Sequence, residues 1–152
     1  MKKKLIFAVC AGAFLFTMAC SSDDDSSSPS NTTVEEVVNT VTSGTWRITS
    51  YIDSGNNETA DFTGYNFTFG STSLLTATNG TNTYEGTWSV TDDNDDSPSD
   101  DIDFNILFSA PTAFADLSDD WDVVERTSTK IRLVDDSGGN GGTDYLTFEK
   151  NP

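Results

Sequence analysis

The amino-acid sequence predicts an all-β fold: an eight-stranded, antiparallel, up-and-down barrel preceded by a short helix. Eight segments after residue 44 alternate apolar and polar residues with a period of two, the pattern of strands that bury one face. Turn-forming residues separate these segments. Consecutive strands with short links favour a closed barrel, because closure leaves no open sheet edge. A two-sheet sandwich is the alternative, since one sequence does not reveal strand pairing.

A short amphipathic segment precedes the strands. Thr33 and Glu36 have the spacing of a capping box, which marks the start of a helix. The valines that follow lie on one helical face: Val34, Val37, Val38 and Val41. Valine is a poor helix former, so we expect this helix to depend on contact with the barrel. Ser43-Gly44 ends it.

The strands are predicted from the alternation itself. It is clearest where Ile102, Phe104, Ile106 and Phe108 alternate with polar residues. The segment 110–120 interrupts the pattern and is predicted as a loop with a helical turn. The predicted strands are residues 45–50, 65–69, 74–78, 84–90, 102–108, 121–125, 130–134 and 145–149.

The alternation also predicts which side chains fill the barrel. An eight-stranded barrel is just wide enough to be filled by side chains or to hold one small ligand, and the sequence leaves both open. The candidate ligand-binding residues are Trp46, Tyr65, Phe67, Tyr84, Trp88 and Phe104. The predicted interior contains these and Ile48, Phe69, Val90, Ile102, Ile106, Phe108, Ile131, Leu133, Leu146 and Phe148.

The N-terminus carries the pattern of a secretory signal. Three lysines at 2–4 precede an apolar run from Leu5 to Ala19, which is shorter than the roughly 20 residues of a membrane-spanning helix. Cys20 and a stretch of Ser and Asp follow. We therefore expect a signal peptide over residues 1–19, an acidic flexible tether over 20–33, and the barrel domain over 34–152.

The end of the apolar run implies a lipid anchor. Thr17-Met18-Ala19-Cys20 resembles a bacterial lipobox, which implies cleavage before Cys20 and acylation of Cys20 with palmitate or similar chains. Such lipidation gives stable membrane attachment. The acidic residues after Cys20 resemble the export signals of surface lipoproteins in Gram-negative bacteria. The resemblance implies an outer-membrane lipoprotein exposed on the cell surface; a plain secreted protein is the alternative.

Charge and composition exclude several functions. Loss of the three signal lysines leaves five basic residues against 25 acids, a net charge of −20, which repels nucleic acid. The sequence has no histidine, which removes the usual catalytic triads and most zinc sites. We therefore expect no enzyme, no catalytic residue and no cofactor.

One acidic loop is a weak candidate for calcium. Asp92, Asn94, Asp96 and Asp100 have part of the ligand spacing of a calcium-binding loop. Ser97 stands where such a loop needs glycine, and no glutamate follows at the last ligand position. A solvated hairpin loop is the favoured interpretation, with a loose calcium site as the alternative.

Two Gly-Thr-Trp triplets carry a further resemblance. Gly44-Thr45-Trp46 after a short helix is similar to the opening strand of lipocalins, and Gly86-Thr87-Trp88 to the second such triplet of small bacterial lipocalin-like domains. Lipocalins place an arginine on the last strand across from the tryptophan; this chain has Lys150 near that place. The resemblance covers residues 44–150 and implies a lipocalin-like barrel.

The sequence thus suggests two functions. The first is capture of a small hydrophobic ligand inside the barrel, without catalysis; the second is a structural or protein-interaction module with a solid core. A cavity of roughly 300 Å³ or more lined by the tryptophans would favour capture. The expected partners are the membrane, through the lipid anchor, and a small hydrophobic ligand. The sequence does not identify a protein partner.

Overall fold

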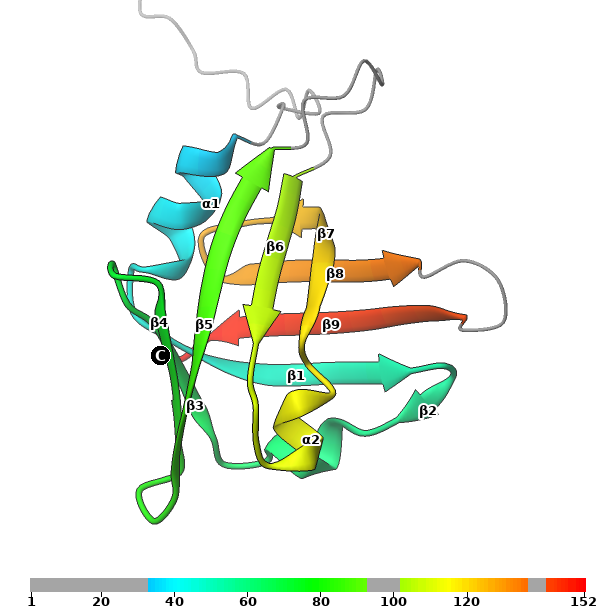
Figure 1. Ribbon diagram of the computed structural model, residues 1–152. Helices are drawn as coiled ribbons and strands as arrows, with labels where there is room; N and C mark the ends of the chain where they lie inside the picture. Colours follow the sequence, from blue (N-terminus) through cyan, green and yellow to red (C-terminus); the bar gives the residue numbers. More distant parts are fainter. Residues whose placement is uncertain (1–32, 93–101, 137–141) are drawn as a thin grey trace, which may run out of the picture. The chain divides into compact units, whose positions relative to one another are not determined.

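The computed structural model describes residues 33–92, 102–136 and 142–152, all within the compact unit that spans residues 31–152 (Figure 1). Cys20, Asn94, Asp96 and Asp100 lie outside the described residues, so the lipid-attachment and calcium predictions are not placed. None of the helices in the described ranges has the length and apolar content needed to span a bilayer.

Eight strands follow one another around a closed antiparallel barrel, as the sequence predicted. The sheet order is β2-β1-β3-β4-β5-β6-β7-β8-β9, and pairing of β1 with β9 closes the barrel. The two-residue β2 is an additional strand paired with the end of β1. The strands are β1 Thr45–Asp53, β2 Asn56–Asn57, β3 Asn66–Phe69, β4 Leu74–Thr78, β5 Thr83–Asp92, β6 Ile102–Leu107, β7 Asp119–Arg126, β8 Lys130–Asp136 and β9 Thr143–Lys150.

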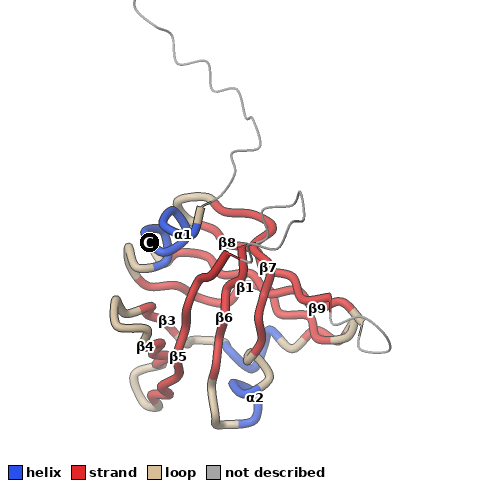
Figure 2. The backbone as a smooth tube through the Cα atoms, turned by 45° about the horizontal axis from the view of Figure 1, so that its top comes forward, coloured by secondary structure: helices blue, strands red, loops and turns tan. Residues whose placement is uncertain are grey.

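Helices lie at the two ends of the barrel (Figure 2). Helix α1, Val34–Val41, precedes β1, and the capping box between Thr33 and Glu36 is formed. Helix α2, Thr112–Ala115, connects β6 to β7, and the 3₁₀ helix η1, Thr59–Phe62, follows β2. We call the two ends of the barrel the α1 end and the α2 end.

Helix α1 packs its valines against the barrel. Val37 and Val41 are buried in the common core. The indole Nε1 of Trp46 donates to the carbonyl of Val41 at 2.8 Å, which satisfies a carbonyl that the helix end leaves free. On β7, Arg126 forms an ion pair with Glu36 at 3.1 Å. Packing and one indole bond therefore hold a helix that would be marginal alone.

A bulge in β1 breaks the predicted alternation. Ile48 pairs with Phe148 and Ser50 with Thr147, so Thr49 is an extra residue on β1. Beyond the bulge Tyr51 is buried where uninterrupted alternation would have placed Ser50. The Tyr51 hydroxyl donates to the carbonyl of Asp116 at 2.7 Å and so ties β1 to the segment after α2.

The predicted interior is the observed core, with three exceptions. Tyr65, Tyr84 and Val90 are partly exposed, and every other side chain assigned to the interior is buried. Buried side chains outside the predicted interior, apart from Val37 and Val41 of α1, are Tyr51, Phe62, Leu75, Ala77, Phe114, Leu117 and Trp121. Leu75 and Ala77 follow the two-residue period of β4, whereas Phe62, Phe114 and Leu117 lie in or next to helical segments, where that period does not apply.

Helix α2 closes its end of the barrel with one aromatic ring. The ring centroid of Phe114 lies 5.3 Å from that of Phe62, 5.3 Å from that of Phe108 and 6.0 Å from that of Phe67. The indole Nε1 of Trp121 donates to the carbonyl of Leu117 at 3.1 Å and fixes the chain where it leaves α2. Phe114 thus fills the mouth that an open barrel would leave accessible.

Gly86 is required by close packing between β5 and the end of β6. A Cβ atom at this position would lie 2.8 Å from Cδ1 of Phe108 and would also collide with the carbonyl oxygen of Leu107. The Phe108 ring packs against Phe114, and the Leu107 oxygen belongs to the backbone, so neither group can move aside easily. The glycine of the Gly-Thr-Trp triplet on β5 is therefore required by packing.

Substitution Gly86→Ala is expected to lower the free energy of unfolding by about 1–3 kcal/mol, the usual cost of forcing an extra methyl group into a packed site. Urea unfolding followed by tryptophan fluorescence measures it. Ser89→Ala, on the exposed side of the same strand, should stay within about 0.5 kcal/mol. Equal stability of the two variants would show that β5 and β6 do not pack this closely.

Candidate functional site

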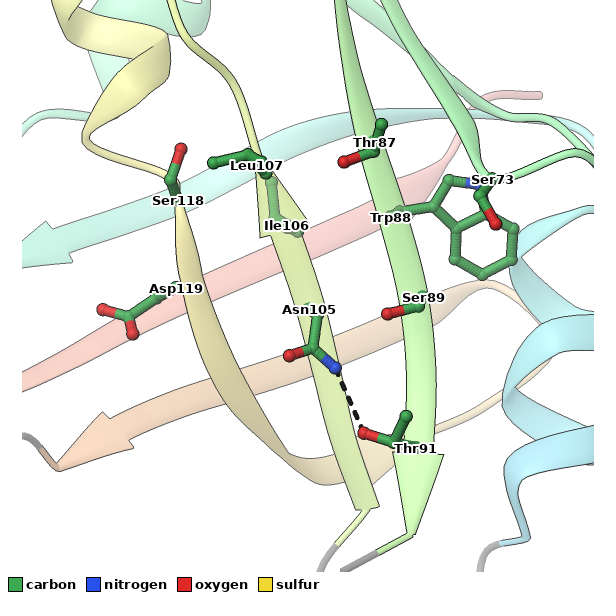
Figure 3. Close-up of a pocket in the computed structure, with 10 residues that line it drawn as sticks. All are labelled: Ser73, Thr87, Trp88, Ser89, Thr91, Asn105, Ile106, Leu107, Ser118 and Asp119. Atoms are coloured by element: carbon green, nitrogen blue, oxygen red, sulfur yellow. Dashed lines mark hydrogen bonds between the residues drawn. The ribbon is translucent and has the colours of Figure 1, made fainter.

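A cleft on the outer wall of the barrel is the candidate site (Figure 3). Its volume is about 640 Å³, and strands β5, β6 and the start of β7 line it. The cleft forms because β4 begins at Leu74, which pairs with Thr87 on β5. Beyond Thr87, the turn before β4 borders β5 instead of a strand, and Trp88 N–H donates to the carbonyl of Ser73. The outer wall is therefore hollowed at this point.

Hydroxyl and amide groups form the floor of the cleft. Alternation along β5 directs Thr87, Ser89 and Thr91 outward, and Asn105 on β6 pairs with Ser89 (Figure 3). The Asn105 amide donates to the Thr91 hydroxyl at 3.2 Å. Among the described residues, the hydroxyls of Thr87 and Ser89 make no hydrogen bond within the protein, so both are available to a ligand.

The surface at one side of the cleft is aliphatic, with Leu107 in the lining and Leu74 just outside it. Leu107 on β6 lines the cleft with 57% of its surface exposed. Thr87 pairs with Leu107 on one side and with Leu74 on the other, and Leu74 is 42% exposed. These leucines are two of the four large apolar residues exposed in the described structure. The cleft thus combines an apolar side with a polar floor.

A carboxyl group stands where the cleft meets the α2 end. Asp119, at the start of β7, lines the cleft beside Ser118 (Figure 3). Burial, with smaller contributions from Asp120 and from the charge of Asp135, raises the pKa of Asp119 to about 6. The ordinary value is 3.8, so this carboxyl is partly protonated near pH 6.

Acidic residues crowd the α2 end while the basic residues lie elsewhere. Burial and then the charges of Asp53, Asp144 and Asp116 raise the pKa of the Tyr51 hydroxyl, which indicates a negative local potential. Carboxylates of this end among the described residues are Asp53, Glu58, Asp61, Asp116, Asp119, Asp120, Asp135, Asp136 and Asp144. The basic residues, in the half of the barrel toward the α1 end, are Arg47, Arg126, Lys130, Arg132 and Lys150.

Those basic residues are engaged where they lie. Arg47 pairs with Glu149 at 3.1 Å, and Glu125 pairs with Lys130 at 2.6 Å and with Arg132 at 3.2 Å. The two cations are the main cause that lowers the pKa of Glu125. Lys150 pairs with Trp46 in the strand register and donates to the Ser43 hydroxyl at 2.9 Å. Among the residues that the structure describes, no Lys or Arg lines the cleft.

The predicted ligand-binding residues do not form one site. Trp46 and Phe67 are 0% exposed and Phe104 is 1% exposed, all within the packed core. Tyr65 and Tyr84 stack at 5.8 Å near the α2 end, and both contact Phe114. Only Trp88, the sixth, lines the outer cleft.

The cleft residues themselves were missed from the sequence. Ser73, Thr87, Ser89 and Asn105 belong to the polar faces of predicted strands or to a turn, which usually face solvent. The sequence did contain one indication of this site: Thr87, Ser89 and Thr91 place three hydroxyls at successive outward positions of β5. Within the described ranges, no group of three or more potential metal-ligand side chains converges.

Comparisons with known proteins add little to this geometry. No protein-family model matches the chain, and no curated protein matches it. The crystal structure of a DUF4847 family protein from Bacteroides vulgatus matches with a TM-score of 0.47 and 21% sequence identity. The match covers 76% of this chain and 97% of that one. This likeness is too distant to carry a functional conclusion.

The raised pKa of Asp119 predicts a pH-dependent stability. The pKa of Asp119 is higher in the folded state than in the unfolded state, so the protonated carboxyl stabilises the folded state relative to the ionised one. This stabilisation is complete below about pH 3.8 and is lost as the pH rises through about 6. Asp119→Asn, which stays neutral, should therefore raise the melting temperature by a few degrees at about pH 7.5 but not at about pH 3.5.

Thermal unfolding followed by circular dichroism tests this, with Glu85→Gln on the exposed face of β5 as the control. The control should show no comparable pH-dependent gain. A melting temperature of Asp119→Asn that equals wild type at every pH would contradict the burial of this carboxyl.

Proposed function

We propose that this protein is a surface lipoprotein of the outer membrane that acts as a non-catalytic interaction module. Its barrel is a solid scaffold, and its binding surface lies on the outer wall. The shape of the domain supports a binding role, since a rigid β-barrel can hold side chains of several strands in fixed positions.

The packing of the interior carries this proposal. A ligand cavity exposes the side chains that line it to a water-sized sphere, whereas Trp46 and Phe67 have no exposed surface at all. Phe69 contacts Trp88, Phe104 and Phe148 at centroid distances of 5.4, 5.4 and 5.5 Å. The rings therefore occupy the space that captured ligand would need, and they favour the solid module over capture of a hydrophobic molecule.

The N-terminal sequence supports the proposed location. Cys20 follows a lipobox-like triplet, and the tether of residues 20–33 is acidic and rich in Ser. This composition is typical of a spacer between a lipid anchor and a folded domain. The absence of histidine from the whole sequence supports a role without catalysis.

Native mass spectrometry of protein extracted gently from the producing bacterium tests the solid interior. We expect the mass of the chain and its anchor alone, because a well-packed core offers no volume for a second lipid or pigment. A co-purified hydrophobic molecule that survives in repeated preparations, and is lost on unfolding, would instead establish ligand capture.

Metabolic labelling tests the anchor separately. Labelled palmitate should enter the wild-type chain in a bacterial host that processes lipoproteins, and Cys20→Ser should abolish the label because it removes the acylated sulfur. Cys10→Ser, in the apolar run, is the matched control and should keep the label. Palmitate retained by Cys20→Ser would refute anchoring at this residue.

A further inference from the structure

The chemistry of the outer cleft identifies the kind of partner it fits. We propose that the cleft binds an extended segment of a basic polypeptide, with an aliphatic side chain on Leu74 and Leu107 and a lysine or arginine beside Asp119. This inference rests on the proposed function, because it assigns a partner to an interaction module whose binding surface lies outside the barrel.

The dimensions of the cleft suit a short peptide segment. At about 3.3 Å per residue, the floor from Thr87 to Thr91 extends about 13 Å, and three strands span about 10 Å across it. A volume of about 640 Å³ lies within the range of sites that hold small ligands or a few residues. The site is open on the outer wall, so it does not enclose a bound segment.

The aliphatic side of the cleft supplies the apolar contact. Leu74 and Leu107 flank Thr87 directly in the strand register, so their exposed surfaces lie on one row of the outer wall. A leucine-sized side chain placed there would cover surface that now faces water. The hydroxyls of Thr87 and Ser89 can then bond the partner's backbone groups, which a purely apolar patch could not satisfy.

The charges around the cleft determine whether it attracts a cationic or an anionic partner. Within the described ranges, the lining of the cleft carries one carboxyl, Asp119, and no cation. Asp116 and Asp120 lie close to Asp119 in sequence at the same end, whereas the basic residues lie toward the α1 end. Such a distribution attracts cationic groups and repels anionic ones before contact is made. It also disfavours a second copy of this acidic chain.

The state of Asp119 makes the binding sensitive to pH. Asp120 on β7 and Asp135 on β8 are the charged groups that act on this carboxyl. A bound cation favours the ionised form, so the affinity should fall as the pH is lowered through about 6. The ion pair between Asp119 and the partner's cation would be partly exposed, so screening by added salt should also weaken the binding.

Titration of the full-length protein with a synthetic probe tests the proposal. The probe is a short peptide of alternating lysine, leucine and serine residues, and its counterpart carries glutamate in place of lysine. Isothermal calorimetry at about pH 7.5 should detect the lysine peptide alone, and the affinity should fall severalfold at about pH 5.

Variants locate the binding. Leu107→Ser should weaken it about tenfold and Asp119→Asn about threefold, as expected for one lost apolar contact and one partly exposed ion pair. The matched controls are Val124→Ser, an equally exposed apolar residue of β7 outside the cleft lining, and Glu35→Gln on α1. Both controls should bind as wild type does.

Three results would overturn the proposal: no binding of the lysine peptide, equal binding of the glutamate peptide, or control variants that weaken binding as much as the cleft variants. Spermidine that binds as tightly as the lysine peptide would show that the cleft takes a free polyamine and not a polypeptide. None of these results would place a ligand inside the barrel, so the solid interaction module would stand. A lipid found in the interior would refute that module instead.

Discussion

Mutual packing of aromatic rings inside a narrow barrel is the constraint on which this structure depends. Both cysteines lie in the N-terminal residues outside the described domain, so no disulfide within the domain holds the strands together. The core instead places Phe67 between Phe114 of α2 and Phe148 of β9, with centroids at 6.0 and 5.4 Å. Because the rings fill the interior, the proposed binding surface lies on the outer wall, where the register of β4 on β5 leaves a cleft.

The three tryptophans connect this core to the loops. Each indole N–H donates to a backbone carbonyl: Trp46 to Val41 at the end of α1, Trp88 to Gly70 before β4, and Trp121 to Leu117 after α2. A buried indole N–H without a partner would be costly, so these bonds and the ring packing support each other. They explain how a domain with short helices at both ends keeps these helices fixed against the barrel.

Much of the fold could be predicted from the sequence, because alternation with a period of two marks each strand independently of its neighbours. The bulge at Thr49 could not, since nothing local signals the extra residue, and it was the reason that Tyr51 was missed. Phe114 and Leu117 were assigned to a loop whose packing depends on distant strands. The cleft depends on where β4 begins opposite β5, a property of pairing that the residues of either strand do not encode alone.

Xenon binding tests the central claim, the filled interior, most directly, because xenon enters dry apolar cavities that water does not occupy. Crystals of the barrel domain should be pressurised with xenon and the bound atoms located by their anomalous signal. We predict no xenon among Trp46, Phe67 and Phe104, whose side chains are in full contact with their neighbours. An ordered xenon atom between these rings would show a cavity at the centre of the barrel and would contradict the account.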